Sequence, residues 1–137
     1  MLLLRGADLS TAASALHADA DGREKVTGYQ GLRDLDVIDG PDGSRLFVRG
    51  DTLALVYVGG AALPAGLDHA DLVAAVGSDG DHLRSRQGKT ARLHVVAEDG
   101  IAWSEENGQV AFVEIFPPTS FEDYTREIYV EPPAFNQ

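Results

Sequence analysis

The 137-residue chain contains no cysteine. This excludes disulfide bridges, thiolate metal ligands and cysteine nucleophiles. No apolar run approaches the roughly 20 residues that a membrane-spanning helix needs. The opening residues, MLLLRG, place only three leucines before an arginine, and this apolar run is too short for a secretory signal. We therefore expect a cytoplasmic protein that does not insert into a membrane.

Positive charge is also scarce. The chain has 11 Lys and Arg against 22 Asp and Glu, a formal net charge of -11. Contacts to phosphate need lysine and arginine, so this balance argues against nucleic acid and anionic membranes as partners. It suits a cationic partner, or it simply keeps the protein soluble. A chain of this length can bury about two thirds of its unfolded surface, and we expect a single domain over residues 1–137.

Residues 91–116 contain the clearest structural pattern. Three apolar runs of strand length (ARLHVVA, IAWS and VAFVEIF) are separated by segments containing Asp-Gly and Asn-Gly. This pattern predicts a three-stranded antiparallel meander with two tight hairpins. Residues 35–58 form a more degenerate copy, with a turn at Pro41. Within that copy, residues 53–58 are apolar on both faces, which is typical of a central strand.

Helices are predicted in three other stretches. Asp8 or Ser10 can cap a first helix by accepting hydrogen bonds from free backbone N–H groups. Asp68 can cap a second helix, which ends at Gly77. A third, short helix is predicted to open at residues 119–122, whose sequence Thr-Ser-Phe-Glu is a capping box.

Two polar stretches, residues 23–31 and 78–90, are predicted to be loops. The expected fold class is α+β: one antiparallel sheet of about six strands, with helices on one face and a short C-terminal helix. Helix, loop and three strands follow one another twice, over residues 6–59 and 66–117, before a C-terminal region over residues 118–137. This order favours an internal repeat, although any small α+β protein alternates its elements in a similar way. The predicted core comprises Leu16, Val37, Leu55, Leu72, Val73, Val95, Val113 and Ile115.

Residues 66–77 (GLDHADLVAAVG) form a glycine-led, capped helix, and a polar loop and a meander follow it. This arrangement resembles the SmpA/BamE-like module, and two such modules in tandem are similar to the architecture of the β-lactamase inhibitory protein family. The resemblance implies a concave sheet that binds other proteins and carries no catalytic residues. The chain departs from the family pattern because it has no lipobox and no cysteine pair. It also has Val-Gly-Ser-Asp at residues 76–79, where the family usually has Leu-Gly-x-Pro.

The candidate binding residues fall into two groups. Trp103, Phe112 and Phe116 lie at alternating positions of neighbouring strands and are predicted to share one face. If that face is open, it is an interaction surface; if helices cover it, which we expect, the aliphatic face points outward. Glu114 could act as an acid or base in a sheet pocket, although a charge on an exposed face is the favoured alternative. The second group is a basic run that could bind a carboxylate or phosphate, or be a solvated loop: Arg84, Arg86, Lys89 and Arg92.

A metal site has weaker support. Histidines and carboxylates flank the second predicted helix and could bind zinc or a ferrous ion. Nothing in the sequence brings them to one side of a site, so we expect no metal and no cofactor. The residues concerned are His69, Asp71, Asp79, Asp81 and His82.

The sequence thus favours a non-catalytic protein-binding module, of an inhibitor or immunity type, that uses an uncovered sheet face. Its partner would be another protein or a second copy of the chain. The alternative is a small-molecule-binding protein or an enzyme with a pocket between sheet and helices. An enzyme should show a deep cavity with converging polar side chains. A binding module should show a broad, shallow apolar patch.

Overall fold

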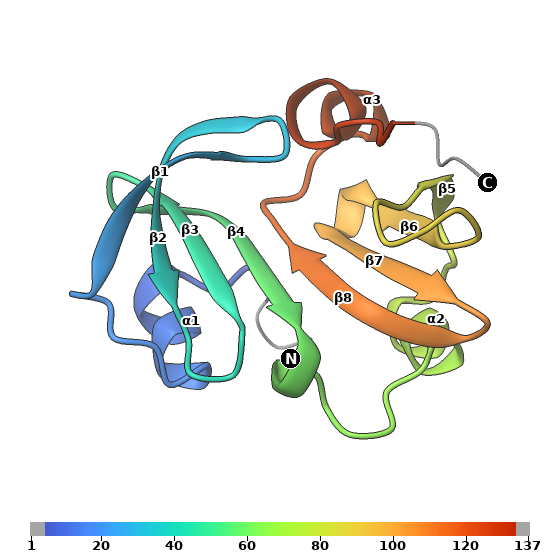
Figure 1. Ribbon diagram of the computed structural model, residues 1–137, viewed down its shortest axis with the longest axis horizontal. Coiled ribbons are helices and arrows are strands. Elements are labelled where there is room, and N and C mark those ends of the chain that lie inside the picture. Colours follow the sequence, from blue (N-terminus) through green and yellow to red (C-terminus); the bar gives the residue numbers. More distant parts are fainter. Residues whose placement is uncertain (1–4, 134–137) are drawn as a thin grey trace.

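The computed structural model describes residues 5–133 and contains one antiparallel sheet of eight strands, in the order β1-β2-β3-β4-β8-β7-β6-β5 (Figure 1). Strands from the first half of the chain meet strands from the second half at β4 and β8. The first half comprises α1 (Leu9–Ala15), β1 (Arg23–Tyr29), β2 (Leu32–Asp39), β3 (Arg45–Arg49), β4 (Thr52–Gly59) and a 3-10 turn, η2 (Gly60–Ala62). The second comprises α2 (His69–Val76), β5 (Asp81–Arg84), β6 (Arg92–Val96), the 3-10 turn η3 (Ala97–Asp99), β7 (Ile101–Glu106) and β8 (Gln109–Ile115). After β8, α3 (Phe121–Asp123) continues into a π-helical turn, η4 (Tyr124–Ile128).

The fold class is the predicted one, α+β with one antiparallel sheet, but the sheet has more strands than expected. The two additional strands, β1 and β5, lie in the polar stretches predicted as loops, and they form the two edges of the sheet. Edge strands carry polar and charged side chains that discourage pairing with other chains. Such sequences lack the apolar–polar alternation that identifies a half-buried strand. Every residue of β5 is at least partly exposed.

Two apolar layers lie on opposite faces of the sheet, because successive residues of each strand point to opposite sides. One layer contains the cross-strand row Ile38, Leu46, Val56 and Ile115, and the other contains the row Val37, Phe47 and Leu55. Ala12 of α1 and Leu72 of α2 pack into the first layer. Tyr124 and Ile128 of η4 pack into the second. Helical segments therefore cover both faces, whereas the sequence predicted helices on one face.

The prediction that Trp103 and Phe112 share a face is wrong. Trp103 pairs with Val113 and faces the layer that contains α2, while Phe112 faces the opposite layer. Both aromatic side chains are fully buried, as is most of Phe116, which agrees with the expectation that the aromatic residues are covered. Val113 and Ile115 do not point outward, because a packed layer covers each face. Of the predicted core, six residues are buried, and Leu16 and Val73 are half-buried.

Each half of the sheet contains one β-bulge. The register of β4 on β3 skips Ala54, and the register of β8 on β7 skips Ala111. A bulge adds one unpaired residue to a strand, and it bends and twists that strand locally. The two bulges therefore help to curve the sheet at the strands where its halves meet.

The seam between the halves is short. β4 pairs with β8 only over residues 56–59. Beyond Ile115 the chain continues with Pro117 and Pro118, which lack the N–H groups that a ladder requires. In the described part of the chain, no strand pairs with residues 52–55 on the side away from β3. The first half of β4 is therefore an unpaired strand edge inside the sheet.

Among residues 5–133, no helix is both long enough and apolar enough to cross a membrane.

Burial of the chain's one tryptophan gives a direct test of the layer assignment. Trp103 has no exposed surface, so neither acrylamide nor iodide should reach its indole ring. We expect weak quenching of its fluorescence in the native protein and strong quenching after unfolding in urea. Equal quenching in the two states would mean that the layer containing Trp103 is open to solvent.

Candidate functional site

The structure brings together three of the eight candidate binding residues. Arg86, Phe112 and Glu114 converge on the sheet face that carries η4. Trp103 lies on the opposite face. Arg84 donates to the carbonyl oxygens of Pro132 (3.1 Å) and Pro133 (3.0 Å), and thus fixes the C-terminal segment to β5. Arg92 of β6 lies opposite Arg84 of β5 in the strand register, and Lys89 lies in the connection between these strands.

Glu114 is buried, so the favoured expectation of an exposed charge is wrong. One of its carboxylate oxygens accepts a hydrogen bond from the Tyr124 hydroxyl at 2.7 Å, and the other accepts one from Tyr29. An Arg86 guanidinium nitrogen lies 3.7 Å from Glu114, and another donates to the Tyr29 hydroxyl at 2.7 Å. The guanidinium also lies over the Phe112 ring, 4.3 Å from its centre. This group of five side chains is called the Glu114 cluster.

The hydroxyls of the Glu114 cluster are held in their protonated form. Burial, together with the negative charge of Glu114, raises the pKa of Tyr29 and of Tyr124 far above the ordinary value for tyrosine. Both hydroxyls can therefore act as permanent donors to the carboxylate. The cluster joins the end of β1, the C-terminal half of β8 and η4, which are distant in the sequence.

Little space remains beside the Glu114 cluster. The cavity there has a volume of about 10 Å³, which is close to the minimum that holds one water molecule. A small-molecule substrate needs a site of roughly 300–1,000 Å³. We therefore interpret the Glu114 cluster as a structural hydrogen-bond network that holds η4 and the β1–β2 hairpin against the sheet.

The raised tyrosine pKa values predict a loss of stability at alkaline pH. Tyrosines in the unfolded chain ionise near pH 10, whereas Tyr29 and Tyr124 keep their protons in the folded protein. Above about pH 10 the unfolded state then binds fewer protons, so the free energy of unfolding falls as pH rises. Each tyrosine adds up to about 1.4 kcal/mol per pH unit. Urea titrations at increasing pH should show a shallower fall for the double variant Tyr29→Phe/Tyr124→Phe, and an unchanged slope would contradict the assignment.

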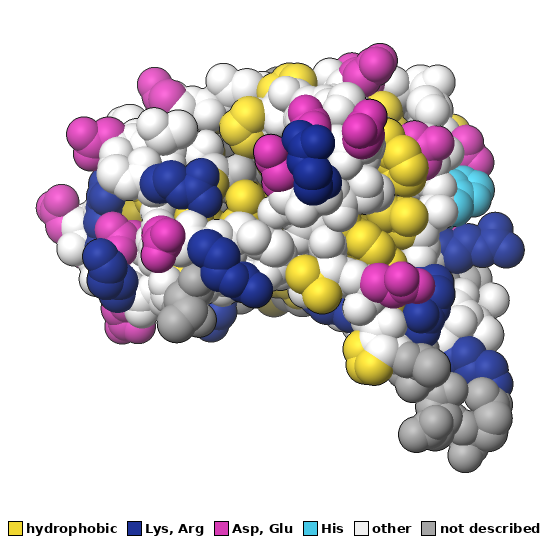
Figure 2. All heavy atoms as spheres, turned by 90° about the horizontal axis from the view of Figure 1, so that it is seen from above, with side chains coloured by type: hydrophobic (Ala, Val, Ile, Leu, Met, Phe, Trp, Pro, Cys, Tyr) yellow, Lys and Arg dark blue, Asp and Glu magenta, His cyan; other side chains and the backbone are white. Residues whose placement is uncertain are grey.

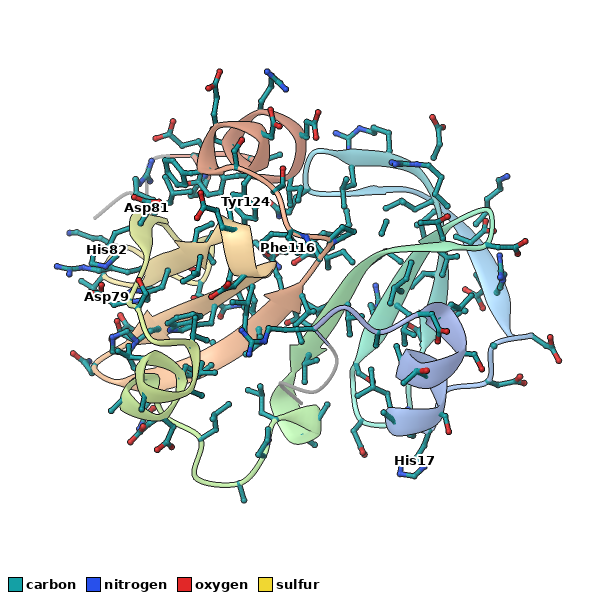
Figure 3. The ribbon with its side chains drawn as sticks, turned by 180° about the vertical axis from the view of Figure 1, so that it is seen from behind. His17, Asp79, Asp81, His82, Phe116 and Tyr124 are labelled. Atoms are coloured by element: carbon teal, nitrogen blue, oxygen red, sulfur yellow. The ribbon has the colours of Figure 1, made fainter. Side chains whose placement is uncertain are left out.

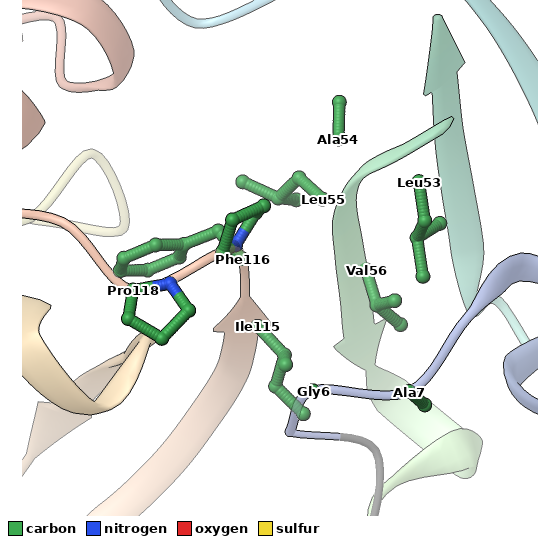
Figure 4. Close-up of a pocket in the computed structure, with 10 residues that line it drawn as sticks. Gly6, Ala7, Leu53, Ala54, Leu55, Val56, Ile115, Phe116 and Pro118 are labelled. Atoms are coloured by element: carbon green, nitrogen blue, oxygen red, sulfur yellow. The ribbon is translucent and has the colours of Figure 1, made fainter. Parts of the chain in front are cut away.

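A groove lies where β4 and β8 diverge (Figure 4). A cavity of about 190 Å³ and a shallower hollow of about 400 Å³ share Leu53, Ala54, Pro117 and Pro118, and we call the two together the β4 groove. The unpaired first half of β4 forms one wall, and the proline pair that ends β8 forms the other. The remaining lining residues of the cavity are Gly6, Ala7, Leu55, Val56, Ile115 and Phe116, and those of the hollow are Leu32, Arg49, Thr52, Thr119, Glu127 and Ile128.

Large hydrophobic side chains are seldom exposed on the described surface. Val130 is the single large hydrophobic residue that is exposed among residues 5–133. On the face seen in Figure 2, hydrophobic side chains occur in small patches among charged ones. The broad open sheet face expected from the sequence is therefore absent from the described residues. The β4 groove is instead a concave surface lined largely by apolar side chains.

A second polar cluster lies in the layer that contains α2. His94 is buried, and its two ring nitrogens lie 3.1 Å from the Asp79 carbonyl oxygen and 2.8 Å from a Glu105 carboxylate oxygen. The ring of His69 lies over that of His94, with their centres 4.3 Å apart. Trp103 donates its indole N–H to Nδ1 of His69 at 3.0 Å. The backbone N–H of Gly108 and the side chain of His94 lower the pKa of Glu105 and so favour its carboxylate form.

Sequence reasoning found only part of this second cluster. Of the candidate metal ligands, His69 belongs to it, and His82 lies at its edge with Asp79 3.3 Å away (Figure 3). Asp71 instead accepts from the backbone at the start of α2. His94 and Glu105 were missed, because only the pairing of β5, β6 and β7 places them beside the start of α2. The row formed by His82, His94 and Trp103 across these strands is the signal that could have identified the cluster.

No family model matches the chain, and comparisons with curated proteins and with solved structures gave no match either. The resemblance to SmpA/BamE-like modules therefore stays a prediction.

Proposed function

We propose that this chain is a non-catalytic protein-binding module that accepts an extended segment of a partner protein in the β4 groove. The observation that carries the proposal is the unpaired edge of residues 52–55 on the wall of an apolar depression. An unpaired strand edge offers main-chain donors and acceptors that an extended peptide can use by strand addition. Four strand residues span about 13 Å, so the segment that pairs directly would be short.

The bulge at Ala54 supports this assignment. Ala54 lines both parts of the β4 groove, and its register with β3 is interrupted. Bulges occur often next to functional sites, where they end pairing or redirect a side chain. A small side chain at this position also leaves room for a peptide to approach the main chain. The opposite wall, Pro117 and Pro118, keeps the groove open because it cannot complete the ladder.

The partner segment is expected to be apolar at its centre and basic at its flanks. The shared lining residues Leu53, Ala54, Pro117 and Pro118 suit an apolar side chain. The chain carries a formal net charge of -11, which attracts cationic partners and slows the approach of anionic ones. A small-molecule function is less well supported, because the better enclosed cavity is smaller than an ordinary ligand pocket.

We also infer that residues 6–59 and 66–117 are two copies of one ancestral unit. The capping residues Asp8 and Asp68 precede α1 and α2, and each helix is followed by four antiparallel strands. The bulge residues Ala54 and Ala111 lie 57 positions apart, each in the last strand of its half. A β-bulge at the matching position of both halves supports duplication better than the same order of helices and strands does.

Peptide selection tests the proposed function. Peptides selected from a displayed library on the immobilised full chain should contain an apolar centre and basic flanks. Ala54→Arg places a long charged side chain in the β4 groove and should weaken binding at least tenfold, or about 1.4 kcal/mol. Ala111→Arg is the matched control, because it changes the bulge residue of the other half. Circular dichroism would verify that both variants are folded.

Three outcomes are informative. Loss of affinity for Ala54→Arg alone supports the β4 groove as the binding site. Equal affinities of both variants for the selected peptides would contradict it. Concentration-dependent dimerisation that Ala54→Arg abolishes, without any selected peptide, would show instead that a second copy of the chain occupies the groove.

A further inference from the structure

The second half of the sheet carries polar side chains where the first half carries aliphatic ones. Positions in the two halves can be matched by counting along the strand pairs from the bulges and from the helix starts. In the first half these positions form part of an ordinary apolar layer. The matched pairs are Leu9 with His69, Ile38 with His94, Leu46 with Trp103, and Val48 with Glu105.

This comparison shows that the fold does not require polar groups at these positions. Burying a polar side chain lowers stability unless hydrogen bonds replace its contacts with water, and the first half avoids that requirement altogether. Three of the four histidines in the chain gather here: His69, His82 and His94. A group of side chains that can bind metals, one of them buried and two half-buried, indicates a binding role when it stands at positions where aliphatic residues would pack.

The contacts of His94 are those expected of a metal-ligating histidine. The Asp79 carbonyl oxygen, 3.1 Å from Nδ1, can only accept, so Nδ1 carries a proton. The Glu105 carboxylate, 2.8 Å from Nε2, can also only accept. The ring nitrogen and the carboxylate oxygen thus lie side by side, and both are atoms of a type that ligates transition metals. A backbone carbonyl that fixes one ring nitrogen and leaves the other for a metal is the usual outer contact of a ligating histidine.

We propose that His69, His94 and Glu105 bind one divalent transition-metal ion of the zinc class. Each residue offers one ligand atom, and the three atoms lie within 4.8 Å of one another. Ligand atoms around a zinc ion are about 3–3.5 Å apart. His69 therefore has to close in slightly, and Glu105, whose carboxylate oxygen lies 2.8 Å from His94 Nε2, has to move slightly away from that nitrogen. Both side chains are only half-buried and can make these movements.

The donor set defines the class of ion. Two imidazole nitrogens and one carboxylate suit zinc and neighbouring transition metals better than calcium or magnesium, which prefer oxygen ligands. Three protein ligands leave a fourth position for water. On binding, the ion breaks the direct contact between His94 Nε2 and Glu105. It also breaks the hydrogen bond from Trp103 to His69, since either the ion takes Nδ1 or the ring proton moves to Nδ1.

The experiment uses the full chain after removal of metals with a chelator. Zn²⁺ is added while calorimetry records the stoichiometry and fluorescence records Trp103, the chain's one tryptophan. We expect one ion per chain, a change in Trp103 emission that saturates at the same stoichiometry, and proton release detected by repeating the calorimetry in different buffers. Co²⁺ should give the visible absorption of a nitrogen- and oxygen-ligated tetrahedral or five-coordinate site.

Matched variants separate binding at this cluster from binding elsewhere. His69→Leu and Glu105→Gln should each weaken Zn²⁺ binding at least tenfold. His69→Leu installs the residue found at the matched position of α1, so the fold should be retained. His17→Ala is the control, because His17 lies away from His82 (Figure 3), and it should leave the affinity unchanged.

The proposal is overturned if neither Zn²⁺ nor Co²⁺ binds at millimolar concentration, because hydrogen bonds alone then hold the cluster together. It is also overturned if His17→Ala weakens binding as much as the two cluster variants do. Should His69→Leu fail to fold, Glu105→Gln alone decides between these outcomes, since Glu105 is half-buried and the substitution preserves its shape.

Discussion

Replacing Glu114 by alanine is expected to lower the free energy of unfolding by about 3–5 kcal/mol. The substitution removes the carboxylate that accepts from Tyr29 and Tyr124 and lies beside Arg86. Two buried hydroxyls then lose their acceptor, and each unsatisfied group costs about 1–3 kcal/mol. Arg86 keeps 31% of its side chain exposed, so water compensates part of its loss. Urea denaturation monitored by circular dichroism measures the change.

A double-mutant cycle distinguishes the loss of the hydrogen bonds in the Glu114 cluster from the loss of side-chain packing. Glu114→Gln keeps the volume of the side chain, and Tyr124→Phe removes only a hydroxyl. If the two groups interact as the 2.7 Å hydrogen bond indicates, their coupling energy should be about 0.5–3 kcal/mol. Additive effects would mean that the Glu114 cluster does not act as a unit.

Replacing Phe112 by alanine should destabilise the protein by about 3–5 kcal/mol, the usual range for a large buried aromatic residue. Phe112 has no exposed surface, and its ring stacks against Tyr57 with the centres 5.4 Å apart. The substitution leaves a cavity beneath the Arg86 guanidinium and removes the cation–π contact. Thermal or urea unfolding of the variant measures this effect.

The neighbouring residue is the control for Phe112. Ala111 is exposed in the bulge of β8, and Ala111→Ser should change stability by less than about 0.5 kcal/mol. A small effect at Phe112 together with a large one at Ala111 would mean that the face assignment of β8 is reversed.

The sequence predicted the elements that have a strong periodic signal. The meander over residues 91–116 and the helix capped by Asp68 are present, because Asp-Gly and Asn-Gly turns and a capping box act locally. The edge strands β1 and β5 were missed, since their pairing comes from neighbouring strands and not from their own side chains. The two bulges were missed for the same reason, and they affect which residues face each layer.

The candidate site was predicted less completely than the fold. Glu114, Phe112 and Arg86 were identified as residues of interest, but their partners Tyr29 and Tyr124 come from segments far away in the sequence. The β4 groove arises where β8 ends and β4 continues, so no single motif encodes it. In the sequence, only the two prolines that follow β8 mark one wall of the β4 groove.

Hydrogen exchange at β4 tests the proposed function most directly. In the free protein, the amides of residues 52–55 that do not bond to β3 should exchange fast, while those of residues 56–59 should be protected by β8. A selected peptide should slow exchange at residues 52–55 at least tenfold and leave the bulge at Ala111 unchanged. Bound peptide with unchanged exchange at residues 52–55, or with protection elsewhere on the sheet, would contradict strand addition in the β4 groove.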